Sequence, residues 1–147
     1  MARYNGRVVV AKVDASGERI KGKLTSWIKK HPDEVYFDSM PEYETWNYMT
    51  THSIKHVYHK ELLLFDTTDT EEFKDGKLVE TKQRSIKYTP DYYLPDYDAY
   101  IEVKGYADDL FKLRWKLFKL KGYTGYLVYD LKDFVAVLKL LEKRSTN

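Results

Sequence analysis

The chain has 147 residues, 43% of them apolar and 33% charged, with a formal net charge of +2 and no cysteine. These proportions are typical of a single globular domain over residues 1–147, and the lack of cysteine excludes disulfides, thiol nucleophiles, iron–sulfur clusters and Cys-ligated zinc. No apolar run reaches the length of a membrane span and the first residues lack the apolar core of a signal peptide, so we expect a soluble, cytoplasmic protein without a membrane partner.

The positive charge is concentrated at the N-terminus. Residues 1–30 carry eight Lys or Arg against two acids, whereas the remaining residues carry 17 against 21. A basic arm of this kind suits contact with nucleic-acid phosphates, because neutralising a phosphate releases counterions. Arg7, Lys21 and Lys23 are its candidate contacts, and a solvated, partly ordered terminus is the alternative.

The N-terminal half alternates short strand patterns with helical ones. The predicted elements are a strand over 7–13, a turn at Ser16-Gly17, a basic helix over 23–30, a helix over 40–51 and a strand over 56–65. Ser39 precedes the helix over 40–51 as a candidate N-cap.

The C-terminal half supplies the rest of an α/β pattern. After a hairpin turn at Asp75-Gly76, we predict strands over 84–93 and 98–104, a helix over about 108–121, a strand over 125–129 and a helix over about 131–143. The helix over 108–121 should bury a leucine stripe made of Leu110, Leu113, Leu117 and Leu120. The order αβββαβα indicates an α/β domain with a mixed sheet flanked by helices.

Two carboxylates fall on neighbouring predicted strands. Asp91 lies on one strand and Glu102 on the next, a separation that fits a hairpin bringing both to one edge of the sheet. Alternation places Lys104 on the same face as Glu102, opposite the apolar face of that strand. Two hard oxygen ligands favour Mg²⁺, and a lysine beside them can stabilise charge developing on a phosphate. The set indicates phosphodiester hydrolysis without an organic cofactor.

The same residues resemble a known motif. Pro90-Asp91 followed by Glu102-Val103-Lys104 resembles the PD-(D/E)XK nuclease superfamily, and the element order over about 37–130 is similar to the αβββαβ core of that family. With the stretch over 37–42, these motifs look like a group of small phage and prophage nucleases. They are more distantly similar to phage-type Holliday junction resolvases, which act as dimers.

The resemblance implies a restriction-endonuclease-like core and a role for each matching position. Asp91 and Glu102 would be metal ligands, with the Val103 carbonyl as a third. Lys104 would be the catalytic lysine, and Glu42 would support the metal or its water. The implied cofactor is Mg²⁺, with Mn²⁺ able to substitute, and the implied partners are DNA and, in a homodimer, a second copy of the chain.

Some of these residues have competing interpretations. Ser39-Met40-Pro41-Glu42 also matches an S-x-x-E capping box, in which Glu42 only bonds back to the helix N-terminus. Lys112 and Lys116, four residues apart on a predicted helix, are candidate DNA-backbone contacts, with a solvated helix face as the alternative. His52, His56 and His59 form an H-x3-H-x2-H series that is not expected to bind zinc, because its members fall on different elements and no cysteine completes the set.

The sequence therefore predicts a Mg²⁺-dependent endonuclease that cuts DNA, encoded by a phage and acting in the cytoplasm of a bacterial host. Branched or junction DNA is the first substrate suggested by the family analogy. A non-catalytic DNA-binding or packaging accessory protein with the same fold is the alternative from another class. An RNA-directed or a restriction-type nuclease also stays open.

Overall fold

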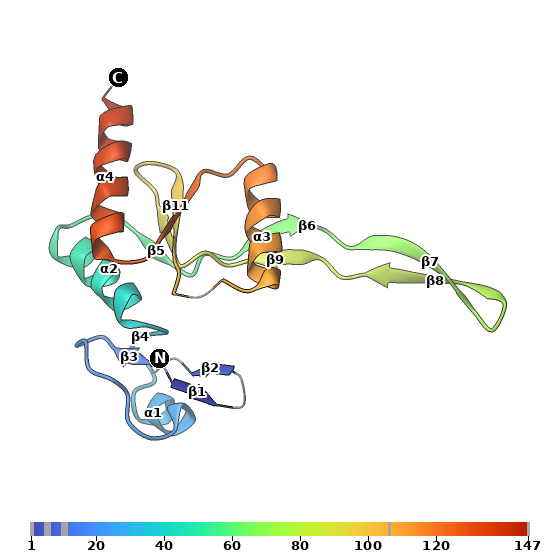
Figure 1. Ribbon diagram of the computed structural model, residues 1–147, viewed down its shortest axis with the longest axis horizontal. Coiled ribbons are helices and arrows are strands. Elements are labelled where there is room, and N and C mark those ends of the chain that lie inside the picture. The colour runs from blue at the N-terminus through green and yellow to red at the C-terminus, as the bar shows by residue number, and fades with distance from the viewer. Residues whose placement is uncertain (1, 5–6, 10–11, 106, 147) are drawn as a thin grey trace.

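The computed structural model describes residues 2–4, 7–9, 12–105 and 107–146 of a mixed α/β protein (Figure 1). Its helices are α1 (Leu24–Lys30), α2 (Met40–Thr51), α3 (Asp109–Leu120) and α4 (Leu131–Ser145). Its strands are β1 (Ala2–Tyr4), β2 (Arg7–Val9), β3 (Val13–Asp14), β4 (Tyr36–Phe37), β5 (Val57–Tyr58), β6 (Leu62–Phe65), β7 (Thr68–Lys74), β8 (Lys77–Gln83), β9 (Ile86–Tyr88), β10 (Tyr92–Leu94), β11 (Ala99–Val103) and β12 (Gly125–Val128). Within these described ranges no helix combines the length and the apolar character that crossing a membrane requires.

The central sheet has the strand order β12-β11-β10-β5. β11 is antiparallel to β10 and parallel to β12, so the sheet is mixed, as the sequence predicts. All five residues of β11 are buried, because α2 and α4 cover one face of the sheet and α3 covers the other (Figure 1). The expectation that Glu102 lies on a face other than the apolar, buried one is therefore wrong, since both faces of β11 are covered.

Two apolar cores lie on the two sides of this sheet. The core against α2 and α4 contains Met49, Tyr92, Leu94, Ala99, Ile101, Val103, Val128, Phe134, Leu138 and Leu141. The core against α3 contains Leu62, Leu64, Tyr88, Tyr100, Phe111 and Phe118. Alternate residues of β11 enter alternate cores, as the period of a strand requires.

The buried face of α3 differs from the predicted leucine stripe. Leu110 and Leu113 are each 54% exposed and Leu120 is 71% exposed. The helix instead packs on the sheet through aromatic residues that are also spaced by three and four, Phe111, Trp115 and Phe118. Each aromatic ring buries more apolar area than a leucine, so the aromatic stripe determines the orientation of the helix.

Two predicted strands are each divided in two. The strand predicted over 56–65 is interrupted at His59, whose φ of 55° lies in the left-handed region and ends the pairing of β5. The strand predicted over 84–93 is interrupted at Pro90, which has no N–H to donate to a ladder. β6 therefore pairs with β9 as a separate ribbon, while β5 and β10 join the central sheet.

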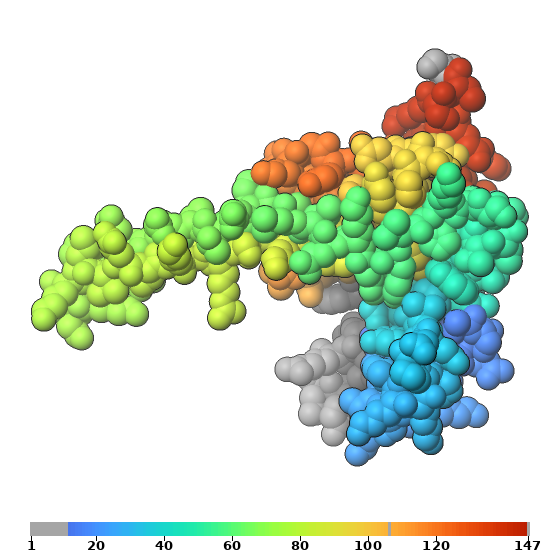
Figure 2. All heavy atoms as spheres, turned by 180° about the vertical axis from the view of Figure 1, so that it is seen from behind, coloured from blue at the N-terminus to red at the C-terminus, as the bar shows by residue number. Residues whose placement is uncertain are grey.

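A long β-hairpin projects from the body of the protein (Figures 1 and 2). β7 and β8 pair over their whole length around the Asp75-Gly76 turn, which confirms the predicted hairpin signal. Phe73 and Leu78 face each other near the tip and are 76% and 52% exposed. The two strands make their main contacts with each other rather than with the rest of the molecule.

The described part of the basic N-terminal arm is folded rather than loose. β3 pairs with β4, and Val13 is only 2% exposed. The Phe37 ring is fully buried between α2 and Tyr58, and Lys12 forms an ion pair with Asp38. The helix predicted over 23–30 and the helix predicted over 40–51 are confirmed as α1 and α2. Residues 10–11 of the predicted strand over 7–13 lie outside the described residues.

Gly125 sets how closely α3 approaches the sheet, which gives a test of the packing. A Cβ at Gly125 would lie 2.5 Å from Cε1 of Phe118, a ring that is fully buried. Gly125→Ala should therefore destabilise the protein by about 1–3 kcal/mol in denaturant unfolding. Gly105→Ala is the matched control, because a Cβ at that position meets no atom within 4 Å. Equal stability of the two variants would contradict this account.

Candidate metal centre

Three carboxyl groups and one imidazole meet where β10 begins and β11 ends. Glu42 lies in the first turn of α2, and Asp91 lies in the short link between β9 and β10. Glu102 is the fourth residue of β11, and His59 directly follows β5. Antiparallel pairing places the start of β10 beside the end of β11, so Asp91 and Glu102 are neighbours in space.

Asp91 is held by two hydrogen bonds to β11. Its backbone N–H donates to Oε2 of Glu102 at 3.0 Å, and its Oδ2 accepts from the N–H of Val103 at 2.8 Å. In a paired strand the N–H and C=O of one residue point to the same neighbour, so the Val103 carbonyl faces the Asp91 side as well. The three residues expected as metal ligands therefore lie together.

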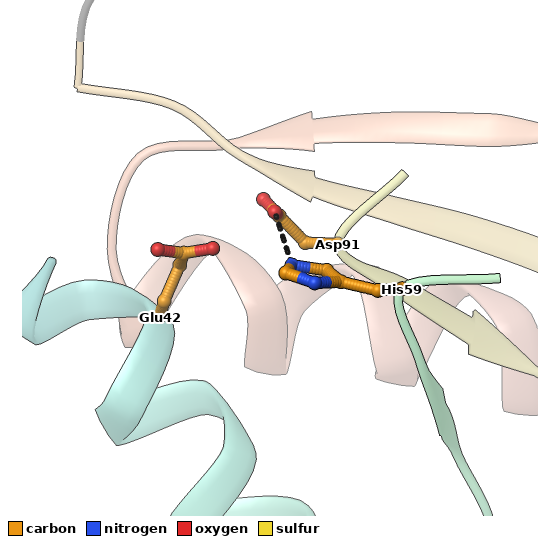
Figure 3. Close-up of side chains that lie close together, drawn as sticks. All are labelled: Glu42, His59 and Asp91. Carbon is orange, nitrogen blue, oxygen red and sulfur yellow. Dashed lines mark ion pairs between the residues drawn. The ribbon is translucent and has the colours of Figure 1, made fainter. Parts of the chain in front are cut away.

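His59 approaches Asp91 from the end of β5 (Figure 3). Its Nε2 lies 3.8 Å from Oδ1 of Asp91, and its backbone N–H donates a 3.0 Å hydrogen bond to the Asp91 carbonyl. The Tyr58 ring stacks on the imidazole with 3.6 Å between centroids. One ligand atom from each of Glu42, His59 and Asp91 lies within 4.8 Å of the other two. In the sequence His59 stands out only as a member of the histidine series that is not expected to bind zinc, because its approach to Asp91 depends on a positive φ and on contacts distant in sequence.

Both interpretations of Glu42 correspond to contacts that are present. Oγ of Ser39 accepts from the Glu42 N–H at 3.3 Å, and Oε2 of Glu42 accepts from the Asp38 N–H at 2.8 Å. This is a capping box displaced by one residue, since the usual donor is the N–H of the N-cap itself. The Tyr92 hydroxyl donates to the Glu42 carbonyl at 2.8 Å and so ties α2 to β10. A carboxylate has two oxygens, so capping leaves one for the cluster.

The three carboxyl groups are buried close together, and this changes their protonation. Glu42, Asp91 and Glu102 are 3%, 9% and 5% exposed. Burial raises the pKa of Asp91 well above its ordinary value, and the charges of Glu102 and Glu42 raise it further. Burial also raises the pKa values of Glu42 and Glu102. Bringing all three to the ionised state therefore requires additional positive charge.

Burial has the opposite effect on the imidazole. It lowers the pKa of His59, although the charge of Asp38 works against this effect. The His59 ring is therefore neutral at neutral pH, and an unprotonated ring nitrogen can act as a metal ligand. The 3.8 Å contact between Nε2 of His59 and Oδ1 of Asp91 is accordingly one between a neutral ring and a carboxyl group rather than a full ion pair.

Lys104 places an ammonium group beside Glu102. Its Nζ lies 3.4 Å from Oε1 of Glu102 and 3.9 Å from the centroid of the Phe111 ring. The Lys104 N–H donates to the Val128 carbonyl at 2.8 Å, which fixes the residue at the end of β12. The ammonium lies on the α3 side of the sheet and lowers the pKa of Glu102 against the effect of burial.

The basic residues expected to contact DNA do not gather at this cluster. Lys112 and Lys116 are exposed on α3, and Lys21 and Lys23 are exposed ahead of α1. The side chain of Arg7 lies outside the described residues. The histidine series also does not converge, since His52 stacks on Tyr48 at the end of α2 and His56 bonds to the carbonyl of Ile54.

The donor set fits a divalent cation. Carboxylate and carbonyl oxygens are the ligands of Mg²⁺ and Mn²⁺, and neutral imidazole is a common ligand of transition metals. Asp91 is the central member, with Glu102 and the Val103 carbonyl on one side and Glu42 and His59 on the other. A cation here would offset the cost of burying these charges, which raises the pKa values of the three carboxyls. Comparison with family models, curated proteins and solved structures finds no significant match to this chain.

The raised pKa of Asp91 predicts a pH-dependent effect of Asp91→Asn on the metal-free protein. Below the ordinary pKa of 3.8, Asp91 is protonated in both the folded and the unfolded chain. As pH rises the unfolded chain ionises first, so the folded wild type loses stability until pH passes its raised pKa. Asn stays neutral, and each unit of elevation corresponds to about 1.4 kcal/mol.

The Tm of Asp91→Asn relative to wild type, measured by thermal melts in EDTA, should therefore increase as the pH is raised above the ordinary pKa of 3.8. Asp96→Asn is the control, because Asp96 is exposed in the turn between β10 and β11. A Tm difference between Asp91→Asn and wild type that is independent of pH would contradict the raised pKa.

Proposed function

We propose that this protein is a metal-dependent phosphodiesterase that hydrolyses DNA. The observation that supports this most strongly is the burial of three carboxyl groups, those of Glu42, Asp91 and Glu102, with the Lys104 ammonium beside Glu102. Such a cluster is unfavourable for stability, because each buried charge loses its hydration and repels the others. It is useful to a protein that binds a divalent cation and carries out chemistry on a phosphate beside it.

Each residue has a separate task in this proposal. Asp91 and Glu102 hold the cation with the Val103 carbonyl, while Glu42 and His59 complete its surroundings from α2 and from the end of β5. When bound, the cation supplies Lewis-acid polarisation of a phosphoryl oxygen and lowers the pKa of an attacking water. Lys104 donates hydrogen bonds to the phosphate and stabilises the negative charge that develops there.

The resemblance of Pro90-Asp91 and Glu102-Val103-Lys104 to the PD-(D/E)XK motif supports the same conclusion. It favours a restriction-endonuclease-like core, Mg²⁺ or Mn²⁺ as the cation and DNA as the substrate. Branched or junction DNA remains the first substrate to test. A DNA-binding accessory protein without catalysis is the competing proposal, and an activity assay separates the two.

Removing one carboxylate charge should reduce cleavage strongly. Asp91→Asn and Glu102→Gln keep the size of the side chain but lose the negative charge that holds the cation, whose stabilisation of the transition state is worth several kcal/mol. We expect a loss in cleavage rate of about a hundredfold or more. The assay would use linear duplex, single-stranded, flap and four-way-junction DNA, and RNA, with Mg²⁺ or Mn²⁺. Asp96→Asn is the charge-matched control, and near wild-type cleavage by Asp91→Asn would refute the site.

A nitrogen ligand should favour Mn²⁺ over Mg²⁺. His59→Asn tests this and preserves the backbone, because Asn tolerates the left-handed conformation that His59 adopts. We expect calorimetry to show Mn²⁺ binding weakened about tenfold, equivalent to about 1.4 kcal/mol, and Mg²⁺ binding changed less. His56→Asn serves as the control. An unchanged Mn²⁺ affinity in His59→Asn would place His59 outside the metal centre.

A further inference from the structure

An open cleft of about 400 Å³ lies on the α3 side of the sheet, next to the carboxyl cluster. Lys87, Lys104 and Arg114 bring three positive charges to its walls, and Glu102 and Asp108 bring two negative ones. Both carboxylates are already engaged: Glu102 accepts from the Asp91 N–H and contacts Lys104, and Asp108 caps α3 by accepting from the Phe111 N–H at 2.7 Å. With Lys104 paired to Glu102 inside the cleft, Lys87 and Arg114 are the lining cations that remain for an incoming anion.

Among the three basic residues that line the cleft, Arg114 is the one without an ion pair in the described part of the chain. Lys104 is paired with Glu102, and Lys87 lies 3.6 Å from Glu61. Arg114 is exposed, and within the described part of the chain it has no ion pair or hydrogen bond. A guanidinium group presents paired N–H donors whose geometry matches two oxygens of one phosphate.

The wall of the cleft has further features that suit a nucleotide. Leu110, one turn before Arg114 on the same flank of α3, lines the cleft and is 54% exposed, so it offers apolar surface to a sugar or base. The Tyr88 ring forms part of the wall, with its hydroxyl buried beside Glu102. The volume lies in the range of pockets that hold one small molecule, which is too small for a duplex.

The helix separates Arg114 from the lysines that the sequence suggested. At about 100° per residue, Lys112 and Lys116 each lie roughly 160° around α3 from Arg114. They therefore belong to the opposite flank of the helix, and neither lines the cleft. This difference supplies a matched control on the same helix.

We propose that the cleft binds one nucleotide of the DNA strand beside the phosphodiester that is cut, with Arg114 holding its phosphate. This inference rests on the proposed function, because it takes the anion to be a phosphate of the substrate strand. The nucleotide would lie against Leu110, and its neighbour along the strand would reach Lys104 and the carboxyl cluster.

The test is binding of a fluorescein-labelled single-stranded oligodeoxythymidine, measured by anisotropy over a range of salt concentrations with Ca²⁺ in place of Mg²⁺. Arg114→Ala should weaken binding about tenfold and make the slope of log K against log salt shallower by about 0.7. Arg114→Lys should recover part of the affinity, because it keeps the charge but not the paired donors. Lys112→Ala and Lys116→Ala should stay within about twofold of wild type.

Binding by Arg114→Ala within twofold of wild type, an equal loss in Lys112→Ala, or a wild type that does not bind the oligonucleotide would overturn the inference. The proposed function fails separately. Wild type that binds through Arg114 but cleaves none of the DNA substrates would refute the phosphodiesterase and leave the nucleotide site standing. Cleavage of DNA by a protein whose oligonucleotide affinity does not change in Arg114→Ala would refute the nucleotide site and leave the phosphodiesterase standing.

Discussion

Two hydrogen bonds between Asp91 and β11 determine the geometry of the carboxyl cluster. One runs from the Asp91 N–H to Glu102, and the other runs from the Val103 N–H to the Asp91 carboxyl. These bonds continue the contact between β10 and β11 after regular pairing has ended, and they fix two acidic side chains where water is largely excluded. Burial then raises the pKa values of both groups, and the charges of Glu102 and Glu42 raise that of Asp91 further. The position and the protonation of the two acids are thus coupled. The contacts that bury the carboxyl groups also favour their binding of a proton or a cation.

Helices on both faces of the sheet contribute residues near the carboxyl cluster. α2 brings Glu42 to the cluster from one side, and α3 brings Arg114 to the cleft on the other side. β11, which carries Glu102, lies between the two cores. A shift of α2 or α3 therefore changes the distance between that helix and Glu102. The close approach of Phe118 to Gly125 fixes α3, and the hydrogen bond from Tyr92 to the Glu42 carbonyl fixes α2. Each helix is therefore anchored to the sheet near the residue that it contributes.

Local patterns predict much of this fold, and tertiary contacts decide the rest. The proximity of Asp91 and Glu102 is predictable, because a short turn joins two strands and their pairing follows from spacing. The orientation of α3 is not, because a leucine stripe and an aromatic stripe both satisfy the helical period and only packing on the sheet selects the rings around Phe118. His59 carries no local signal, since its contact with Asp91 crosses more than thirty residues of chain. The role of Arg114 is hidden for the same reason, as only the packed helix shows which flank meets the cleft.

The projecting hairpin is inserted between two strands that are already paired. β6 and β9 hold the chain together at its base, so neither core depends on the ribbon formed by β7 and β8. The entropic free-energy cost of closing a loop there rises by only about 0.6 kcal/mol for each doubling of the loop length. The hairpin is accordingly the part of the molecule where insertions and deletions are best tolerated. A reporter peptide or an affinity tag placed at Asp75-Gly76 would leave the carboxyl cluster undisturbed, which a tag at the folded N-terminal segment would not guarantee.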